Sequence, residues 1–177
     1  MVLELSLKSI QFTAEGTTEF RALIYIPEKS DFNIFMPEFQ KKGLQLYVRR
    51  VFITDECKEL VPDYLRFLKG VVDSSDLPLN VSREILQENP LIHKIQKNVV
   101  RKLLSELKKM QESEPARYQE FFREFGRILK EGIQTDSTNQ DKIRELAMYE
   151  SMNTAPGLLM SLKEYTAAMP PEQKEIY

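Results

Sequence analysis

Two runs of β-branched and aromatic residues predict strands early in the chain. They extend from Phe20 to Ile26 and from Leu44 to Ile53, and glycines and prolines bound them. Three phenylalanines, Phe32, Phe35 and Phe39, lie between these runs, and we expect them to fold back onto the sheet. An exposed patch for a partner is the alternative for this segment.

Helical spacing begins after Thr54 or Asp55. A short helix that includes Leu60 is predicted to end near Gly70, and the pair Val71-Val72 then has the pattern of a buried strand. The alternation of strands with helices favours an α/β layered fold.

The second half of the chain has the spacing of helices. A long helix is predicted from Pro90, a second from Pro115 to Gly132, and a third from Gln140 to Tyr149. Ser161 and Glu164 have the spacing of a capping box, which predicts a further short helix. The apolar positions that should face inward are Ile92, Ile95, Val99, Leu103, Leu107, Tyr118, Phe122, Phe125, Leu129, Ile143 and Leu146.

The outer face of the long helix, from Pro90 to Met110, is basic. Against the single acid Glu106, it carries Lys94, Lys97, Arg101, Lys102, Lys108 and Lys109. Such a face is usually only solvated, but it could also grip phosphates, so a nucleic-acid-binding domain is one alternative function. The aromatic residues that would stack on bases lie elsewhere in the sequence.

Composition narrows the possible classes. The 177 residues, 42% of them hydrophobic, suffice for one full domain and part of a second. A net charge of −2 argues against a dedicated nucleic-acid binder. The single cysteine, Cys57, excludes an internal disulfide and fits a reducing compartment, and with His93 as the only histidine no metal site is expected. No stretch approaches the roughly 20 apolar residues that cross a bilayer, so we expect no membrane association.

The segment from Leu77 to Glu84 predicts a stiff loop that ends on a helix. Pro78 fixes its own φ and pushes the residue before it toward an extended conformation. Ser82 is a good N-cap for a helix from Arg83 to about Asn89. One guanidinium is therefore placed on the first turn of that helix.

Three polar side chains converge there. Arg83 and Gln87 are four residues apart on one helix face, and Asn80 comes just before the cap. The group could bind an anion, or Arg83 could simply pair with a surface carboxylate such as Glu84 or Asp76.

Motifs for a self-contained enzyme are missing. The sequence has no Gly-rich phosphate loop, no G-x-S-x-G elbow and no H-E-x-x-H, and its six glycines are not clustered. A nucleophilic serine or cysteine would depend on His93, at the basic start of a helix. We therefore do not expect nucleophilic catalysis within this chain.

Six segments share a more extensive similarity: Glu15 to Leu23, Leu46 to Ile53, Gly70 to Ser74, Asp76 to Glu84, Ser161 to Tyr165 and Gln173 to Tyr177. In this order they resemble the middle domain of the 90-kDa heat-shock chaperone family. The resemblance extends from about Ile10 to the last residue. The run Glu-Gly-Thr-Thr-Glu and the lack of a long charged linker are similar to the bacterial HtpG type.

The resemblance implies a fold and a division of the chain. Residues 1–110 would form a large α/β unit, a three-layer α-β-α sandwich similar to the ribosomal-protein S5 domain 2 fold. Residues 111–150 would form a helical connector. Residues 151–177 would be the truncated start of a smaller α/β unit.

The resemblance also implies a function, as the middle segment of an ATP-dependent chaperone that binds unfolded proteins and assists folding under heat stress. Members of the family resemble split ATPases: a separate N-terminal domain binds ATP and Mg²⁺, and the middle domain directs an arginine toward the γ-phosphate. By correspondence this arginine is Arg83, with Asn80 and Gln87 in support. An arginine suits phosphoryl transfer, which depends mainly on positioning and charge neutralisation.

The implied partners are the protein's own N-terminal nucleotide-binding domain, client proteins and, through a C-terminal domain, a second copy of the full-length protein. We expect this chain by itself to be monomeric, without bound ATP or Mg²⁺, inactive as an ATPase, and cytoplasmic. A passive protein-interaction scaffold is the other alternative function.

Two further residues are implicated in contacts between domains. The resemblance places Phe52 at a hydrophobic contact that helps release the loop carrying Arg83 toward the nucleotide-binding domain. It places Arg49 at a charged contact near the active site. On a strand, Phe52 would lie opposite its sequence neighbours, and Arg49 and Arg50 would alternate across the two faces. Core packing of Phe52 and a simple salt bridge of Arg49 are the alternatives.

Overall fold

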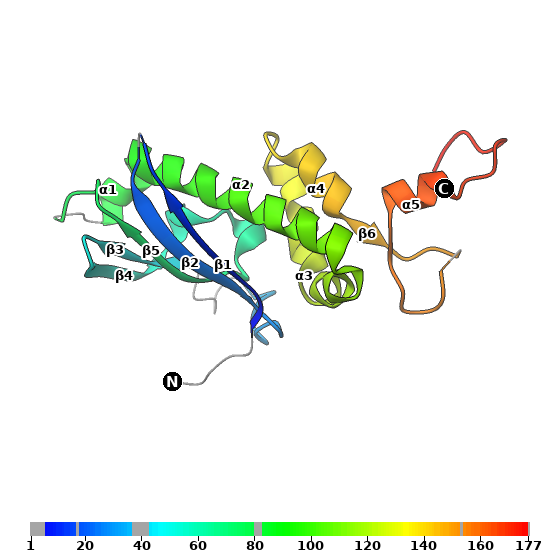
Figure 1. Ribbon diagram of the computed structural model, residues 1–177, viewed down its shortest axis with the longest axis horizontal. Helices are drawn as coiled ribbons and strands as arrows, with labels where there is room; N and C mark the ends of the chain where they lie inside the picture. The colour runs from blue at the N-terminus through cyan, green and yellow to red at the C-terminus, as the bar shows by residue number, and fades with distance from the viewer. Residues whose placement is uncertain (1–5, 17, 37–42, 80–82, 153, 177) are drawn as a thin grey trace. The chain divides into compact units, whose positions relative to one another are not determined.

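The computed structural model of the chain describes residues 6–16, 18–36, 43–79, 83–152 and 154–176, without the side chains of residues 83–85. Its residues form two compact units, Met1–Glu106 and Leu107–Tyr177 (Figure 1). The long helix α2 (Pro90–Ser113) contributes residues to both units. The three-part division of the chain inferred from the resemblance stays a prediction.

A five-stranded mixed sheet forms the first unit. Its strands are β1 (Ser6–Ala14), β2 (Phe20–Pro27), β3 (Leu44–Val48), β4 (Val51–Cys57) and β5 (Lys69–Ser74). They lie in the order β1-β2-β5-β3-β4, and every neighbouring pair is antiparallel except the parallel pair β3 and β5. The predicted mixed α/β class is confirmed, whereas strand β1 was not predicted.

The predicted strand from Leu44 to Ile53 is in fact a hairpin. A two-residue turn joins β3 to β4, and Arg49 and Arg50 occupy it with φ angles of 51° and 66°. Two positive φ values match the right-handed twist of a hairpin, but residues other than glycine, asparagine or aspartate seldom adopt them. The expectation that the two arginines alternate across one strand is therefore wrong, because no usual turn residue marks the break.

One face of the sheet forms the core of the first unit. Phe20, Ala22, Ile24 and Ile26 alternate along β2 and are all buried, and α2 lies across the sheet (Figure 1). On the opposite face of β2, Leu23 is 50% exposed, and the predicted three-layer order is not confirmed.

Close approach of β2 and β5 depends on Gly70. This residue has a φ of 137°, and a Cβ there would collide with the carbonyl oxygen of Leu23. A side chain at this position would force the two central strands apart.

The predicted helix between Asp55 and Gly70 is replaced by two 3-10 turns, Lys58–Leu60 and Asp63–Leu65. The apolar residues of the pattern, including Leu60 and Phe67, are nevertheless buried. Pro62 stands between the turns and has no N–H for a continuous α-helix.

The second unit is mainly helical. It contains the end of α2 and then α3 (Pro115–Thr135), α4 (Gln140–Leu146), the short paired strands β6 (Met148–Tyr149) and β7 (Met160–Ser161), and α5 (Leu162–Ala167). All the positions predicted to face inward on α2, α3 and α4 are buried. The capping box of Ser161 and Glu164 is present as predicted.

Aromatic rings fill the core of the second unit. Tyr118 lies 5.6 Å from Phe121 between ring centroids, and Phe121 lies 5.8 Å from Phe125. The Tyr118 hydroxyl donates a 2.6 Å hydrogen bond to the carbonyl oxygen of Leu146, which ties α3 to the end of α4. None of the described helices combines the length and the apolar composition of a membrane-spanning segment.

Candidate functional site

Helix α1 (Arg83–Glu88) starts at the arginine that the sequence singled out. Gln87 is exposed on this helix, on the turn that follows Arg83. The backbone of Arg83 is described, but its side chain, together with Asn80 and the expected cap Ser82, lies outside the described residues.

Two buried leucines anchor the segment that carries the arginine. Leu77 is 0% exposed before the loop, and Leu86 is 2% exposed within α1. Leu79, in contrast, is 51% exposed. Leu77 and Leu86 therefore pack in the core on either side of Arg83, as expected if α1 has a defined position.

The segment leaves the sheet from a point that is tied to β2. The Glu19 N–H donates a 2.6 Å hydrogen bond to Oδ2 of Asp76, and the Ser75 N–H donates to the carbonyl oxygen of Glu19 at 3.3 Å. The sequence suggests Asp76 only as a possible ion-pair partner of Arg83. Its role here follows from the strand register, which local sequence does not reveal.

The Arg49–Arg50 turn holds the same strand end from the other side. The Arg49 N–H donates to the Ser74 carbonyl at 3.1 Å, and its Nε donates to the Ser75 carbonyl at 3.1 Å. The Arg50 N–H donates to Oδ1 of Asp73, also at 3.1 Å. The Arg49 guanidinium thus binds a backbone carbonyl group. A simple salt bridge was one alternative for this residue.

These residues also line a pocket of about 410 Å³ at the end of the sheet. Its charges are balanced, because three arginines face three carboxylates: Arg21, Arg49 and Arg50 against Glu15, Glu19 and Asp73. A balanced set of this kind suits contact with a polar protein surface better than capture of a free polyanion.

Phe52 lies on the surface of the hairpin. It pairs in register with Tyr47, and the two rings meet edge to face with centroids 5.5 Å apart. Phe52 is 53% exposed and its neighbour Val51 is 50% exposed. Packing of Phe52 in the core, the alternative weighed from the sequence, is therefore wrong.

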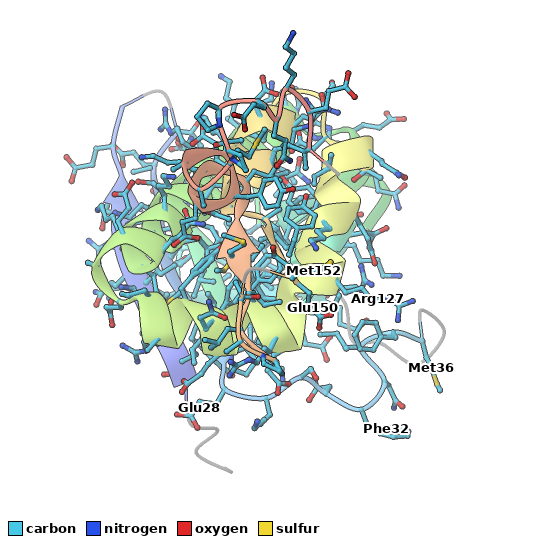
Figure 2. The ribbon with its side chains drawn as sticks, turned by 90° about the vertical axis from the view of Figure 1, so that its right-hand side faces the viewer. Glu28, Phe32, Met36, Arg127, Glu150 and Met152 are labelled. Atoms are coloured by element: carbon cyan, nitrogen blue, oxygen red, sulfur yellow. The ribbon has the colours of Figure 1, made fainter. Side chains whose placement is uncertain are left out.

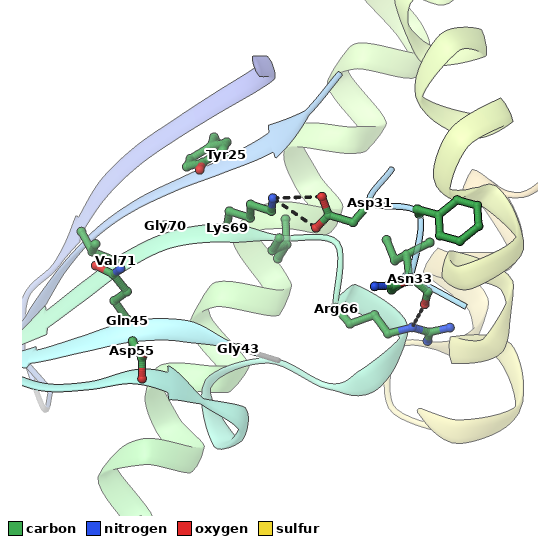
Figure 3. A pocket seen from close by; sticks show the side chains of 13 residues that line it. Tyr25, Asp31, Asn33, Gly43, Gln45, Asp55, Arg66, Lys69, Gly70 and Val71 are labelled. Atoms are coloured by element: carbon green, nitrogen blue, oxygen red, sulfur yellow. Dashed lines mark hydrogen bonds and ion pairs between the residues drawn. The ribbon is translucent and has the colours of Figure 1, made fainter. Parts of the chain in front are cut away.

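A second pocket, of about 600 Å³, lies beside the loop that follows β2 (Figure 3). Lys69 pairs with Asp31 at 3.2 Å, and Arg66 Nε donates to the Ile34 carbonyl at 3.1 Å. These contacts tie the loop to the start of β5 and to the residue that follows the second 3-10 turn, and Ile34 is its buried anchor.

The aromatic residues of this loop do not fold back as expected. Phe32 is 90% exposed, Phe35 and Met36 are each 47% exposed, and Phe32 and Met36 project outward in Figure 2. Phe39 lies outside the described residues. The alternative of an exposed patch describes the loop better.

The cysteine is placed for structure and not for catalysis. Burial, with smaller contributions from the nearby Glu59 carboxylate, raises the pKa of Cys57 from 9.0 to about 12. Its Sγ donates to Oε2 of Glu59 at 3.5 Å. A thiol that stays protonated is a poor nucleophile. Across the described residues, no group of three or more His, Cys, Asp or Glu side chains could hold a metal ion.

Comparison with known proteins identifies the family. The model of the family described as "Hsp90 protein" matches residues 3–177. The chain is 59% identical to chaperone protein HtpG of Geobacter sulfurreducens over 174 residues and 46% identical to HtpG of Bdellovibrio bacteriovorus over 171 residues. These alignments cover 98% and 97% of the chain and 27% of each relative, so the chain spans about a quarter of their length.

A solved structure agrees with the sequence comparison. The middle domain of a Plasmodium falciparum heat shock protein matches with a TM-score of 0.83 and 31% identity, covering 97% of this chain and 66% of the other. The family inferred from the resemblance is confirmed, and its fold is that of the middle domain. The chain belongs to the Hsp90 family.

Proposed function

We propose that this chain acts as the middle segment of an ATP-dependent chaperone and that Arg83 contacts the γ-phosphate of ATP bound in a separate N-terminal domain. Family membership over almost the whole chain supports the chaperone role. In this proposal, client proteins, homodimer formation through a C-terminal domain and a cytoplasmic location belong to the full-length protein.

One observation carries the assignment of Arg83: α1 begins at this residue, in a segment anchored by the buried Leu77 and Leu86. An arginine that must reach another domain needs a fixed base, because each flexible residue adds an ordering cost when the complex forms. The hydrogen bonds from Glu19 to Asp76 and from Arg49 to Ser75 fix the point at which this segment leaves the sheet.

The side chains of the segment suit a phosphate group. The planar guanidinium of Arg83 can donate two parallel hydrogen bonds to phosphate oxygens, and the amides of Asn80 and Gln87 can support it. Mg²⁺ bound with ATP would supply further positive charge to the transferred phosphate, and both would be held mainly by the N-terminal domain. Phe52 would offer its exposed ring to that domain, and Arg49 would position the strand end.

Replacement of the arginine in the full-length protein tests the proposal. Arg83→Ala should leave ATP binding largely intact and slow hydrolysis by roughly 10²- to 10³-fold, since the lost donor acts mainly in the transition state. Arg83→Lys should recover only part of the rate, and Arg144→Ala, on the exposed face of α4, serves as the matched control. An equal loss of binding and hydrolysis in Arg83→Ala would contradict the assignment.

The chain described here allows a second test. We expect no ATP hydrolysis by the chain alone, and stimulation of the separately purified N-terminal domain when the two are mixed. Stimulation that persists with Arg83→Ala would point to a passive scaffold.

A further inference from the structure

A basic groove of about 780 Å³ lies between the end of β1 and the outer face of α2. We call it the α2–β1 groove. Its charged lining residues are Glu15, which follows β1, and Lys94, Lys97, Arg101 and Lys102 on α2. All of them belong to the first unit, and β1 and α2 run past each other there in Figure 1.

The charges of the groove are strongly unbalanced. Four cations line it against one carboxylate, that of Glu15. Of these cations, Lys102 is engaged with Glu106 at 3.2 Å. Lys94, Lys97 and Arg101 are exposed, and no carboxylate of the described residues pairs with them. A fixed excess of positive charge therefore persists in a chain whose net charge is −2.

One of the cations, Arg101, is held in place. Asn98 donates from Nδ2 to the Lys94 carbonyl at 3.0 Å, and its Oδ1 accepts from Nη2 of Arg101 at 2.6 Å. The amide thus fixes the guanidinium through one of its five donors and leaves the others available. Thr13 and Ser105 add exposed hydroxyl donors at the edges of the groove.

The spacing of the cations suits an anion that carries charge on every unit. Lys94, Lys97 and Arg101 follow one another along the helix at intervals of about 4.5 and 6 Å. An extended acidic peptide presents a carboxylate to one side only at every second residue, or about 6.6 Å. A phosphate chain carries charge on every unit and can satisfy unequal intervals.

The lining also separates a bare phosphate chain from a nucleic acid. Phe12 is the only aromatic residue among the described lining residues, and its ring is engaged edge to face with Phe20, with centroids 5.6 Å apart. Single-strand binders stack bases on exposed aromatic rings. The groove has cations without such a platform.

We propose that the α2–β1 groove binds linear inorganic polyphosphate, with Lys94, Lys97 and Arg101 as the principal contacts. Binding should weaken as the salt concentration rises, because the cations of the groove displace counterions from the polyphosphate. With about 0.7 counterions released per contact, three contacts give a slope of roughly −2 for log K against log salt. This inference is independent of the role proposed for Arg83.

The test measures binding of short linear polyphosphate to the 177-residue chain by calorimetry at several salt concentrations. The triple variant Lys94→Gln, Lys97→Gln, Arg101→Gln should bind about 100-fold more weakly, at about fivefold per cation, and lose most of the salt slope. Glutamine keeps the helix propensity of these exposed sites, and circular dichroism checks the fold. The matched control Lys142→Gln, Lys163→Gln, Lys174→Gln removes the same charge from the second unit and should bind like the parent chain.

A second variant guards against an unfolded triple variant. Ser105→Glu leaves every cation in place and adds one carboxylate to the groove, so it should also weaken binding several-fold. Equal weakening in the control variant, or no weakening in Ser105→Glu, would overturn the proposal. So would tighter binding of oligothymidylate with the same number of phosphates, which would instead indicate a nucleic-acid site.

Discussion

The two units of this chain keep their cores together in different ways. The first unit buries mainly aliphatic side chains on one face of a sheet in which β5 pairs with two strands far from it in sequence. The second unit packs a row of aromatic rings on α3 against nearby segments. The sheet leaves strand ends and loops at its rim, and the α2–β1 groove and the Arg49–Arg50 turn lie there. Long-range pairing thus creates sites from distant residues, while local packing mainly supplies stability.

The same contrast extends to buried groups that can ionise. Cys57 in the first unit and Tyr118 in the second both have a pKa raised mainly by burial, from ordinary values of 9.0 and 10.0. As pH rises, the first unit should begin to lose stability before the second.

The largest expected effect is loss of a ring from the aromatic core. Phe125 is fully buried, so Phe125→Ala should lower the free energy of unfolding of the second unit by about 3 to 5 kcal/mol through lost contacts and a cavity. Hydrogen exchange should accelerate in α3 and α4 much more than in the sheet. Phe32→Ala, at a 90% exposed site, is the control and should change stability by no more than about 0.5 kcal/mol. Equal acceleration in both units would mean that their cores unfold as one.

The next largest effect is a difference between the two units in how alkaline pH lowers their free energy of unfolding. The folded state holds the Cys57 proton more tightly than the unfolded state, so its contribution is complete below pH 9.0 and is lost as pH rises toward about 12. The expected slope is up to about 1.4 kcal/mol of unfolding free energy per pH unit. Urea unfolding of the sheet at pH values below and above 9.0 measures it.

Cys57→Ala should flatten that slope, whatever its effect on stability at neutral pH. In this variant Tyr118 is still buried with a raised pKa. Its effect on stability begins only above pH 10.0, the ordinary pKa of a tyrosine. An unchanged slope in Cys57→Ala would assign the alkaline loss to other groups.

The smallest effect concerns a helix cap in the second unit. Ser161 Oγ accepts from the Glu164 N–H at 3.2 Å, and the Glu164 carboxylate accepts from the Ser161 N–H at 2.7 Å. Ser161→Ala should cost about 1 kcal/mol and increase hydrogen exchange in the first turn of α5. Ser161→Asp should retain much of the cap, and protection unchanged in Ser161→Ala would contradict the local origin of this helix.

The sequence predicts the helices of the second unit better than the sheet of the first. The inward residues of α3 and the Ser161 cap depend on spacings of three and four residues, which can be read directly from the chain. Strand β1 pairs with the next strand in sequence but carries no apolar run that marks it, and the contacts that fix the Arg49–Arg50 turn come from the distant strand β5. The run from Leu44 to Ile53 contains no glycine, proline, asparagine or aspartate to mark a turn at Arg49 and Arg50, so sequence reasoning missed the hairpin.

The candidate site shows the same limit. The start of α1 at Arg83 and the exposure of Gln87 follow from local signals. The ties of Asp76 to Glu19 and of Arg49 to Ser75 require the register of three strands. The expectation that Phe32 folds back onto the sheet was wrong and its alternative, an exposed patch, was right, because an aromatic residue in a loop has no periodicity to show which way it faces.

The two positive φ angles at Arg49 and Arg50 have a consequence for protein engineering. Each costs a residue with a side chain roughly 1 to 2 kcal/mol, and an Asn-Gly pair would relieve most of that strain. A thermostabilisation campaign would therefore select this turn early. The Asn-Gly pair would also remove the Arg49 side chain that binds the Ser75 carbonyl. The variant would therefore gain melting temperature but hold the start of the segment that carries Arg83, the proposed ATPase arginine, less firmly.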